Sequence, residues 1–567
     1  MLTLSDEQQA IINYEGNLKV NAVAGSGKTT TILQYAAHRP KASILYLAFN
    51  KSVKMEAEQK LAQLNLQNVR VETAHSLAYK YLSPYRRYKI RFDYKALEIA
   101  QILGLSPKGG DMYHLKLASH IYQFVRYFCN SQAQKVLELN YLETITNMES
   151  LAFATEHYET ISHYTRVFLA KMQRGDIDII HDFYLKQFQL SKPLLSYDYI
   201  LFDEGQDASG AMLNTYLQQP ATKVVIGDQH QQIYGWRFAT NALQQLDFPE
   251  LHLSRSFRFN QEIARLSSSI LGLKTELGQM PKVKIQGMGT HRNIQSRITL
   301  ARSNSKLVSK AIELLIQQKD VSKIYFEGQL QSYTFSEEGG SIYDVLNLYN
   351  GQRHMIKDDL LKTMPSFDHL KDYLEETSDT SLRALVDLVE KYNKDIPFFI
   401  SRIKDCCVDE TQKDQAEMIF STVHKAKGME YDQVFVCDDF INEQQIIDLK
   451  PAIKAQETNP GTISEEINLL YVAATRVKSK LHIPISLLPA SYHINDRQTV
   501  TNELNLKVRL KPIKQKPARS NQYWSHSEEA ELKQLYIQGK TVKEIALLLG
   551  RSQSAIIKRV DKLDLWF

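Results

Sequence analysis

The sequence predicts an α/β protein with mostly parallel sheets, helical insertions and a small all-α unit at its C-terminal end. Short apolar runs that are typical of buried strands alternate with helical segments, which is the pattern of parallel sheets covered by helices. Between about residues 85 and 196 apolar residues recur at helical spacing instead, and three short helices are expected after residue 521. The expected strands are residues 18–20, 44–49, 199–202, 224–226, 298–301, 434–436 and 481–485.

Length and composition indicate a soluble chain of several domains. Its 567 residues, 43% hydrophobic and 23% charged, suit about three to five domains or subdomains. No apolar stretch approaches the roughly 18 residues of a membrane span, and the first six residues lack the features of a signal peptide. We therefore expect a cytoplasmic protein without a membrane partner. Cys129, Cys406, Cys407 and Cys437 lack metal-ligand spacing, and we expect all four to be reduced.

Positive charge is concentrated near the C-terminal end. The net charge is +5, yet the residues from Thr501 onward hold 13 Lys and Arg against 7 Asp and Glu, so the rest of the chain is close to neutral. A nearly neutral domain can still bind nucleic acid through a locally basic groove. The charge distribution therefore supports a polyanionic partner without proving one.

A glycine-rich segment, residues 22–29, directly follows the first expected strand. Gly25 and Gly27 allow backbone N–H groups to approach phosphate oxygens, Lys28 would meet the β- and γ-phosphates, and the Thr29 hydroxyl would bind Mg²⁺. Ala22 stands where the first glycine of this motif is expected. The alternative is an ordinary glycine-rich turn between a strand and a helix.

Two carboxylates follow the expected strand 199–202. Asp203 at the end of this strand is a candidate magnesium ligand, and Glu204 is the candidate base for the attacking water. By itself the pair could be an ordinary solvated acidic loop. Together with the glycine-rich segment it predicts a nucleoside triphosphatase.

The order of further segments resembles that of superfamily 1A DNA helicases of the UvrD/Rep type. Within this family the helicase core of F-box DNA helicases is particularly similar, as seen in Thr-Val-His-Lys-Ala-Lys-Gly at residues 422–428 and in Gly-Asp-Gln-His-Gln-Gln-Ile-Tyr at residues 227–234. The resemblance covers roughly residues 4–481, strongly at the motifs and loosely between them. No F-box is expected ahead of Leu4.

The resemblance implies two RecA-like P-loop motor domains with helical insertions, followed by a small three-helix domain. The expected boundaries are residues 1–84 and 197–262 for motor domain 1A, 85–196 for helical insertion 1B, 263–322 and 412–500 for motor domain 2A, 323–411 for a small insertion 2B, 501–520 for a basic linker and 521–567 for a helix-turn-helix-like domain.

The resemblance also implies an ATP and Mg²⁺ site in the cleft between the motor domains. Gln8 would read adenine, Phe257 would stack on it, and Glu430 would bind ribose. Gln231, Arg258 and Arg476 would act at the γ-phosphate, with Arg476 supplied by the second domain. Alternatives remain open: an exposed Gln8, a surface-loop Gln231 and, for either arginine alone, a surface salt bridge. The remaining nucleotide-binding residues of the set are Ala24, Gly25, Ser26, Gly27, Lys28, Thr29 and Thr30.

Single-stranded DNA and its junctions with duplex DNA are the implied substrate. Trp236 is the sharpest candidate, because a base stacked on an aromatic ring is held without any sequence requirement. The alternative for Trp236 is a buried core residue, and Arg237 could instead serve the nucleotide. The other candidate DNA contacts are Phe49, Asn50, Thr73, His75, Tyr234, Arg302, Asn304, His424 and Lys427.

The C-terminal residues predict a capped three-helix unit behind a basic linker. Ser525 with Glu528 and Thr541 with Glu544 form two capping-box patterns, and Gly539 separates the first two helices. The unit resembles a helix-turn-helix or Myb-like domain, with Lys558 and Arg559 facing duplex DNA. A protein-docking module remains the alternative. The expected core is Trp524, Leu532, Leu535, Ile545, Ala546, Leu549, Ile556 and Leu563.

The resemblance implies an ATP-dependent DNA helicase or translocase that moves 3′ to 5′ on single-stranded DNA, in DNA repair or recombination control. A translocase that strips proteins from DNA and a non-enzymatic DNA-binding scaffold are the alternatives. A helicase–nuclease fusion is disfavoured, because the C-terminal residues lack a cluster of metal-binding carboxylates or cysteines. No residue pattern indicates an oligomeric state.

Overall fold

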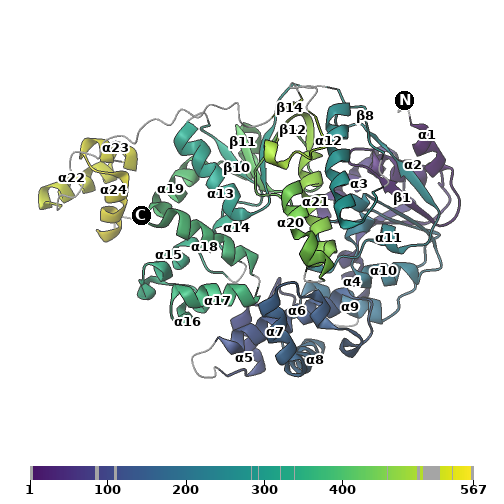
Figure 1. The fold of residues 1–567 in the computed structure, drawn as a ribbon, viewed down its shortest axis with the longest axis horizontal. Helices are drawn as coiled ribbons and strands as arrows, with labels where there is room; N and C mark the ends of the chain where they lie inside the picture. Colours follow the sequence, from purple (N-terminus) through teal and green to yellow (C-terminus); the bar gives the residue numbers. More distant parts are fainter. Residues whose placement is uncertain are drawn as a thin grey trace.

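The structure is a computed structural model, and it confirms the expected α/β fold with two parallel sheets (Figure 1). The sheets carry helices on their faces, as expected for strands that are apolar on both sides. In the part of the chain that the structure describes, no helix is long and apolar enough to cross a membrane. The described residues are 4–83, 88–106, 112–281, 284–290, 293–318, 321–336, 339–377, 379–455, 458–493, 499–501, 524–538 and 540–563.

The first sheet has six parallel strands in the order β3-β2-β4-β5-β1-β6. Consecutive strands are joined through helices, and β3 lies at one edge. The strands are β1 (Leu18–Ala22), β2 (Ile44–Ala48), β3 (Val69–Thr73), β4 (Tyr199–Phe202), β5 (Thr222–Gly227) and β6 (Glu250–Leu253), and the helices are α1 (Asp6–Ile12), α2 (Lys28–Ala37), α3 (Lys51–Gln63), α4 (Ala74–Leu82), α10 (Gly210–Leu217) and α11 (Ala242–Gln245).

The second sheet also has six parallel strands, in the order β10-β11-β9-β12-β13-β14. The expected strand 481–485 is wrong in position, because Lys478 and Lys480 belong to an alternating strand and Pro484 follows its end. The strands are β9 (Arg297–Ala301), β10 (Ile324–Phe326), β11 (Met418–Thr422), β12 (Tyr431–Val436), β13 (Val477–His482) and β14 (Val500–Thr501), and the helices are α12 (Gln261–Gly272), α13 (Asn304–Ile312), α20 (Glu443–Lys454) and α21 (Pro460–Ala474). Strands β7 (Arg255–Ser256) and β8 (Gln286–Gly287) pair separately.

The expected helical stretch forms five helices below the first sheet in Figure 1. The apolar face predicted for the longest of them is confirmed, because all five of its residues are buried. These residues are Leu117, Ile121, Phe124, Val125 and Phe128. The helices are α5 (Ala96–Leu103), α6 (Tyr113–Asn130), α7 (Met148–Glu156), α8 (Tyr158–Arg174) and α9 (His181–Leu190).

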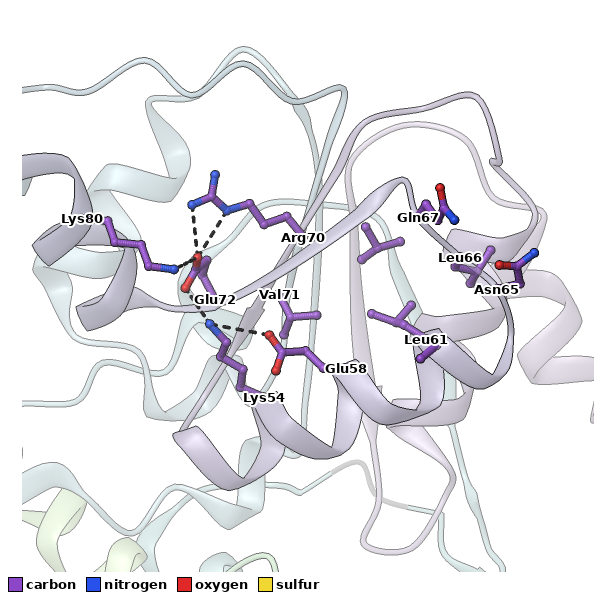
Figure 2. Close-up of a pocket in the computed structure, with 12 residues that line it drawn as sticks. Lys54, Glu58, Leu61, Asn65, Leu66, Gln67, Arg70, Val71, Glu72 and Lys80 are labelled. Atoms are coloured by element: carbon purple, nitrogen blue, oxygen red, sulfur yellow. Dashed lines mark hydrogen bonds and ion pairs between the residues drawn. The ribbon is translucent and has the colours of Figure 1, made fainter.

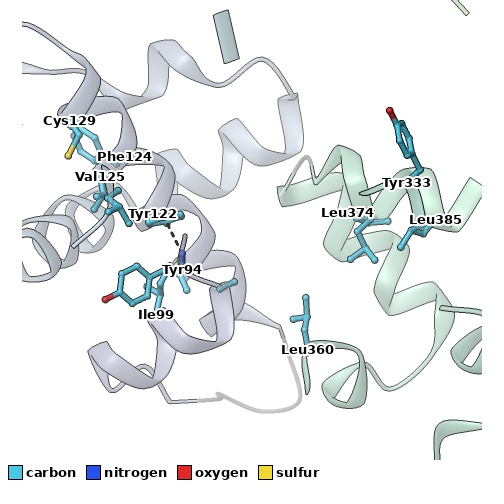
Figure 3. Close-up of a cluster of buried hydrophobic side chains, with 14 of the residues drawn as sticks. Tyr94, Ile99, Tyr122, Phe124, Val125, Cys129, Tyr333, Leu360, Leu374 and Leu385 are labelled. Atoms are coloured by element: carbon cyan, nitrogen blue, oxygen red, sulfur yellow. Dashed lines mark hydrogen bonds between the residues drawn. The ribbon is translucent and has the colours of Figure 1, made fainter. Parts of the chain in front are cut away.

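A second group of helices interrupts the second sheet between β10 and β11 and meets the first group. Helix α17 packs against α6 and α7, and Lys116 Nζ lies 2.7 Å from a carboxylate oxygen of Glu376. Figure 3 shows one cluster of buried side chains with members on both groups. The helices are α14 (Gln331–Thr334), α15 (Ile342–Tyr349), α16 (Asp359–Thr363), α17 (Phe367–Thr377), α18 (Thr380–Tyr392) and α19 (Ile396–Cys406).

The C-terminal unit has the three expected helices, α22 (His526–Ile537), α23 (Val542–Leu548) and α24 (Gln553–Lys562). Both predicted capping boxes are present, and Ser552 caps α24. The predicted core residues are all buried or packed against the core, which also includes Val560. Gly539 and most of the basic linker lie outside the described residues. The four cysteines are free thiols, three of them buried.

An ion cluster fixes edge strand β3 to its neighbouring helices (Figure 2). Glu72 is 2% exposed and lies 2.8 Å from Lys54 Nζ of α3, 3.2 Å from Arg70 Nη2 and 2.5 Å from Lys80 Nζ of α4. Burial by itself would raise the pKa of Glu72, but hydrogen bonds from Lys54, Lys80 and Ser76 lower this pKa to about 2. A cavity of about 630 Å³ between α3 and β3 lies beside the cluster.

We predict that Glu72→Gln lowers the free energy of unfolding by about 1–3 kcal/mol at neutral pH, because it leaves three cations around an uncharged amide. The folded pKa of Glu72 is below its unfolded value, so this contribution is present above about pH 4.3 and is lost as the pH falls toward 2. Urea unfolding at several pH values measures it. Glu58→Gln is the matched control, because half-exposed Glu58 only approaches Lys54 at 3.7 Å; an equal loss in both variants would contradict the assignment.

Candidate functional site

The glycine-rich segment forms a tight loop between β1 and α2. Gly25 and Gly27 have φ values of +74° and +82°, a left-handed conformation that favours glycine. A Cβ atom on Gly25 would lie 2.5 Å from Cβ of Arg258, so the loop also needs glycine for close approach. The side-chain oxygen of Ser26 is buried without a hydrogen-bond partner. Helix α2 begins at Lys28 without a side-chain cap, so its free N–H groups fit an anion such as phosphate.

The two predicted carboxylates lie next to Lys28. Lys28 Nζ is 2.9 Å from Glu204 Oε1, and the Tyr46 hydroxyl donates to Asp203 Oδ2 at 2.7 Å. Burial would lower the pKa of Lys28, but attraction to Glu204, Asp203 and Asp228 raises it. Burial and the neighbouring Glu204 raise the pKa of Asp203, whereas Lys28 and Lys427 hold that of Glu204 below its ordinary value despite burial.

Glu204 adopts a backbone conformation that is rare for a residue with a side chain. Its φ is +53°, and Gln206 Nε2 donates to its carboxylate. Such strain is held by the surrounding structure and is often found at functional sites. Thr29 and Thr30 are half-buried in the first turn of α2, the turn that begins with Lys28. A phosphate-bound Mg²⁺ fits the chemistry of Thr29 and Asp203, a hydroxyl and a carboxylate.

A chain of polar contacts joins the loop after β5 to the end of α21. Asp228 Oδ2 accepts hydrogen bonds from Gln231 Nε2 at 2.8 Å and from the Tyr471 hydroxyl at 2.9 Å. Arg476 Nη2 donates to Gln231 Oε1 at 3.3 Å. Arg476 is 1% exposed, and burial together with the charge of Arg258 lowers its pKa to about 9. Gln231 and Arg476, predicted from opposite motor domains, are therefore in contact.

Arg258 makes a second connection between the two sheets. Arg258 Nε lies 2.9 Å from Glu430 Oε2, and its Nη1 donates to the carbonyl of Thr475 at 2.9 Å. Glu430 also lies 3.1 Å from Lys478 Nζ. Phe257 is 45% exposed, and its backbone N–H donates to the carbonyl of Gly25. Its ring is therefore open to a ligand beside the phosphate loop.

Gln8 is buried rather than exposed, contrary to the alternative considered from the sequence. Its Oε1 accepts from the Ser5 N–H at 3.0 Å and its Nε2 donates to Thr31 Oγ1 at 3.2 Å. A Cβ atom on Gly27 would meet Gln8 Nε2 at 3.1 Å. Gln8 thus lies directly behind the phosphate loop, with its amide engaged by α1 and α2.

Aromatic side chains follow the ends of β2 and β5. Phe49 and Tyr234 stack with ring centroids 5.9 Å apart. Trp236 is 47% exposed, so it is not the buried core residue of the alternative interpretation. The Arg237 guanidinium lies 4.6 Å from the Trp236 ring centroid and that of Arg126, from α6, lies 6.0 Å away. These rings form a surface suited to stacked bases.

Several other predicted DNA contacts have internal partners. Asn50 and Thr73 cap α3 and α4 through their side-chain oxygens. Arg302 pairs with Glu466 at 2.8 Å, and Asn304 begins α13. Burial and the nearby Arg302 lower the pKa of His424 to about 3. His75 Nε2 lies 3.6 Å from Asp182 Oδ1 and remains 41% exposed. The fold therefore uses many of the polar groups of these residues for internal contacts.

Lys427 lies inside the protein rather than on its surface. Its side chain is 6% exposed, forms an ion pair with the fully buried carboxylate of Asp207, and donates to the Gln231 carbonyl at 2.6 Å. Its Nζ is also 4.9 Å from the Tyr234 ring centroid and 5.9 Å from that of Phe49. Lys427 therefore connects Asp207 and Gln231 with the aromatic side chains.

Sequence reasoning missed four residues of this network. Asp228 directly follows β5, so the rule that selected Asp203 could have selected it. Asp207 lies within the predicted acidic motif, only three residues after Glu204. Tyr46 and Tyr471 carry no local signal, because one lies in a buried strand and the other on a buried helix face.

In the C-terminal unit, Lys558 and Arg559 of α24 differ in their surroundings. Lys558 is exposed, whereas Arg559 pairs with Glu529 and lies 5.6 Å from the Trp524 ring centroid. Arg551, not predicted, is 4% exposed and pairs with Glu528 at 3.0 Å. Two ion pairs thus fix α22 against the α24 side of the unit.

Comparison with known proteins agrees with this geometry. Residues 4–247 match the family model of the UvrD/REP helicase N-terminal domain. F-box DNA helicase 1 of Gallus gallus is 30% identical over 519 residues, covering 85% of this chain and 49% of that protein. F-box DNA helicase protein 1 of Schizosaccharomyces pombe is 29% identical over 530 residues, covering 84% and 57%.

A bacterial relative is also similar over part of the chain. ATP-dependent DNA helicase PcrA of Leuconostoc citreum is 26% identical over 313 residues, covering 49% of this chain and 39% of that protein. The chain spans about half the length of the two F-box DNA helicases. The phosphate loop, the paired carboxylates, the two parallel sheets and these matches identify the chain as a UvrD-like superfamily 1 helicase homologue.

Proposed function

We propose that the protein is an ATP-dependent DNA helicase or translocase that moves 3′ to 5′ on single-stranded DNA, separates strands at junctions with duplex DNA, and works in the cytoplasm in DNA repair or recombination control. The observation that carries the proposal is the set of polar contacts between the two sheets, in which Lys28 pairs with Glu204 and Arg476 contacts Gln231. Trp236, 47% exposed, follows Gln231 in the same loop. The names of the relatives, all DNA helicases, support the same substrate.

The phosphate loop would bind ATP, and the adjacent carboxylates would activate water. ATP with Mg²⁺ supplies the phosphoryl group and the cation that neutralises its developing charge. Lys28 and the N–H groups at the start of α2 would hold the phosphates, while Thr29 and Asp203 would hold the metal. Glu204, with its lowered pKa, is ionised at neutral pH and can accept a proton from water. The Lys28–Glu204 ion pair must loosen for Lys28 to meet phosphate.

The arginines from both sides of the cleft would complete the site. Arg476 already contacts Gln231 across the cleft, and Arg258 contacts the Thr475 carbonyl. Guanidinium groups at the transferred phosphate are worth about 10³–10⁵ in rate in related systems. Because these contacts join the two sheets, closure of the cleft and hydrolysis would depend on each other.

The strand would lie on the aromatic side chains beside the cleft. Trp236 offers a ring face to a base, with Arg126 and Arg237 close to its ring for phosphates. Lys427 contacts the cleft through Gln231 and the aromatic pair through Phe49 and Tyr234, so it would transmit the state of one site to the other. The direction of movement rests on the family resemblance.

We predict unwinding of a 3′-tailed duplex with ATP and Mg²⁺, and little unwinding of 5′-tailed or blunt duplexes. Strand separation and ATP hydrolysis are measured on the three matched substrates. A preference for the 5′ tail would contradict the direction. Hydrolysis without strand separation, together with displacement of a protein block, would favour the protein-stripping translocase, and the absence of DNA-stimulated hydrolysis would favour the scaffold.

Two variants connect this activity to the site. Lys28→Ala should abolish ATP turnover, because it removes the cation of the phosphate loop. Glu204→Gln should retain ATP binding while blocking hydrolysis, because it removes the base but keeps the cradle. Hydrolysis at the wild-type rate by Glu204→Gln would contradict its role as base.

We predict that the C-terminal unit recruits the motor to duplex DNA. Removal of residues 511–567 should leave maximal ATP hydrolysis on long single strands nearly unchanged, but weaken binding to tailed duplexes, most visibly at low salt. Fluorescence anisotropy with matched single-stranded and tailed DNA measures both affinities.

A point substitution tests the same prediction in the full chain. Lys558→Ala should weaken binding to tailed duplex, because Lys558 is exposed on α24. Lys533→Ala is the matched control, since it removes an exposed positive charge from α22. If the two substitutions have equal effects, or if the truncation has none, the C-terminal unit does not bind duplex DNA. The protein-docking alternative would then be favoured.

A further inference from the structure

We propose that a row of aromatic rings on α4, α9 and the segment before α5 is a second stacking surface for single-stranded DNA, which continues the strand path beyond Trp236. The aromatic row consists of Tyr79, His75, His181 and Phe92, with Tyr184 beneath them. The inference rests on the proposed function and extends it to a part of the molecule that no helicase motif of the sequence includes, apart from His75.

The rings of the aromatic row form a continuous chain of edge contacts. The ring centroids are 5.8 Å apart for Tyr79 and Tyr184, 5.9 Å for His75 and Tyr184, 6.4 Å for His75 and His181, and 6.5 Å for Phe92 and His181. The Tyr184 hydroxyl also lies 3.0 Å from His181 Nδ1. Edge-to-face contacts of this kind fix the rings without covering their faces completely.

The outer rings are exposed to an extent that core packing does not explain. Phe92 is 86% exposed and Tyr79 45% exposed, whereas Tyr184 beneath them is 5% exposed. The side chain of His75 is 41% exposed. The exposed rings bury little area against the protein core, so core packing alone does not explain their position. A buried ring beneath exposed rings is the arrangement expected of a stacking surface.

The aromatic row is connected to the surface around Trp236. The Arg126 guanidinium is 6.0 Å from the Trp236 ring centroid, and Asn130 lies one turn further along α6, where its amide donates to the Arg126 carbonyl. Asp182 in turn lies 3.6 Å from His75 Nε2 and accepts from Asn130 at 2.9 Å. Helix α6 therefore joins the surface around Trp236 to the part of the aromatic row that holds His75.

The electrostatic surroundings of the aromatic row suit a polyanion. Lys80, which follows Tyr79 on α4, belongs to the ion cluster of Lys54, Arg70, Lys80, Glu58 and Glu72 (Figure 2). These three cations together with Arg126 exceed the carboxylates of Glu58, Glu72 and Asp182 by one charge. Exposed ring faces beside excess positive charge bind single strands without sequence preference. Both features, together with the connection to Trp236, favour a nucleic-acid strand as the occupant of the aromatic row.

The test measures how affinity depends on strand length. Oligothymidylates of increasing length are titrated against the full chain without nucleotide, by fluorescence anisotropy. Phe92→Ala combined with His181→Ala should bind short strands like the wild type, but long strands at least about fivefold more weakly, since one stacked base contributes about 1 kcal/mol or more. Phe92→Trp keeps a ring face and should retain the affinity for long strands.

The controls separate this proposal from the proposed function. Phe398→Ala removes a 45% exposed ring from α19, far from α4 and α9 in Figure 1, and should change nothing. Trp236→Ala should weaken binding at every length. If Trp236→Ala weakens binding while the double variant keeps the wild-type length dependence, the aromatic row does not bind the strand. The proposed function would then still stand. If the wild type binds no strand of any length, the proposed function fails as well.

Discussion

The buried ion pair between Asp207 and Lys427 is the interaction on which the two-sheet architecture depends. Taking both charges out of water costs several kcal/mol, which only close contact and additional hydrogen bonds offset. Lys427 obtains these from Asp207 and from the Gln231 carbonyl. Burial nevertheless raises the pKa of Asp207 to about 6, although Lys427 opposes that shift. Removing either partner would therefore leave an uncompensated charge where the two sheets meet.

Other contacts also lie between the two sheets. Asp228 with Tyr471, Gln231 with Arg476, and Arg258 with Glu430 each join one sheet to the other. In this structure Lys28, which would bind phosphate, forms an ion pair with Glu204 instead. A bound nucleotide would therefore replace internal ion pairs by its own contacts with the same side chains. This replacement would change the contacts of both sheets.

Local patterns predict those parts of the molecule that are determined by neighbouring residues. Apolar runs placed the strands beside Lys28 and Asp203, and the capping boxes at Ser525 and Thr541 placed two helices of the C-terminal unit. In contrast, Lys427 was expected on the DNA face because its motif lies there in relatives, and its burial depends on Asp207, 220 residues earlier in the chain. Contacts between such distant residues have no periodic signal. Similarly, the aromatic row is distributed over three segments and emerges only when α4 packs against α9.

The most direct test is the stimulation of ATP hydrolysis by single-stranded DNA in an Asp207→Asn, Lys427→Met double variant, which leaves no buried charge unpaired. Because Lys427 is buried and connects Gln231 with Phe49 and Tyr234, we expect this double variant to keep its affinity for single strands but to lose most of the stimulation. Lys427→Met alone should show the same loss of stimulation together with a lower free energy of unfolding, because it leaves Asp207 without its cation. Normal stimulation together with weakened DNA binding would contradict this coupling role of Lys427, because it would show that Lys427 contacts DNA directly.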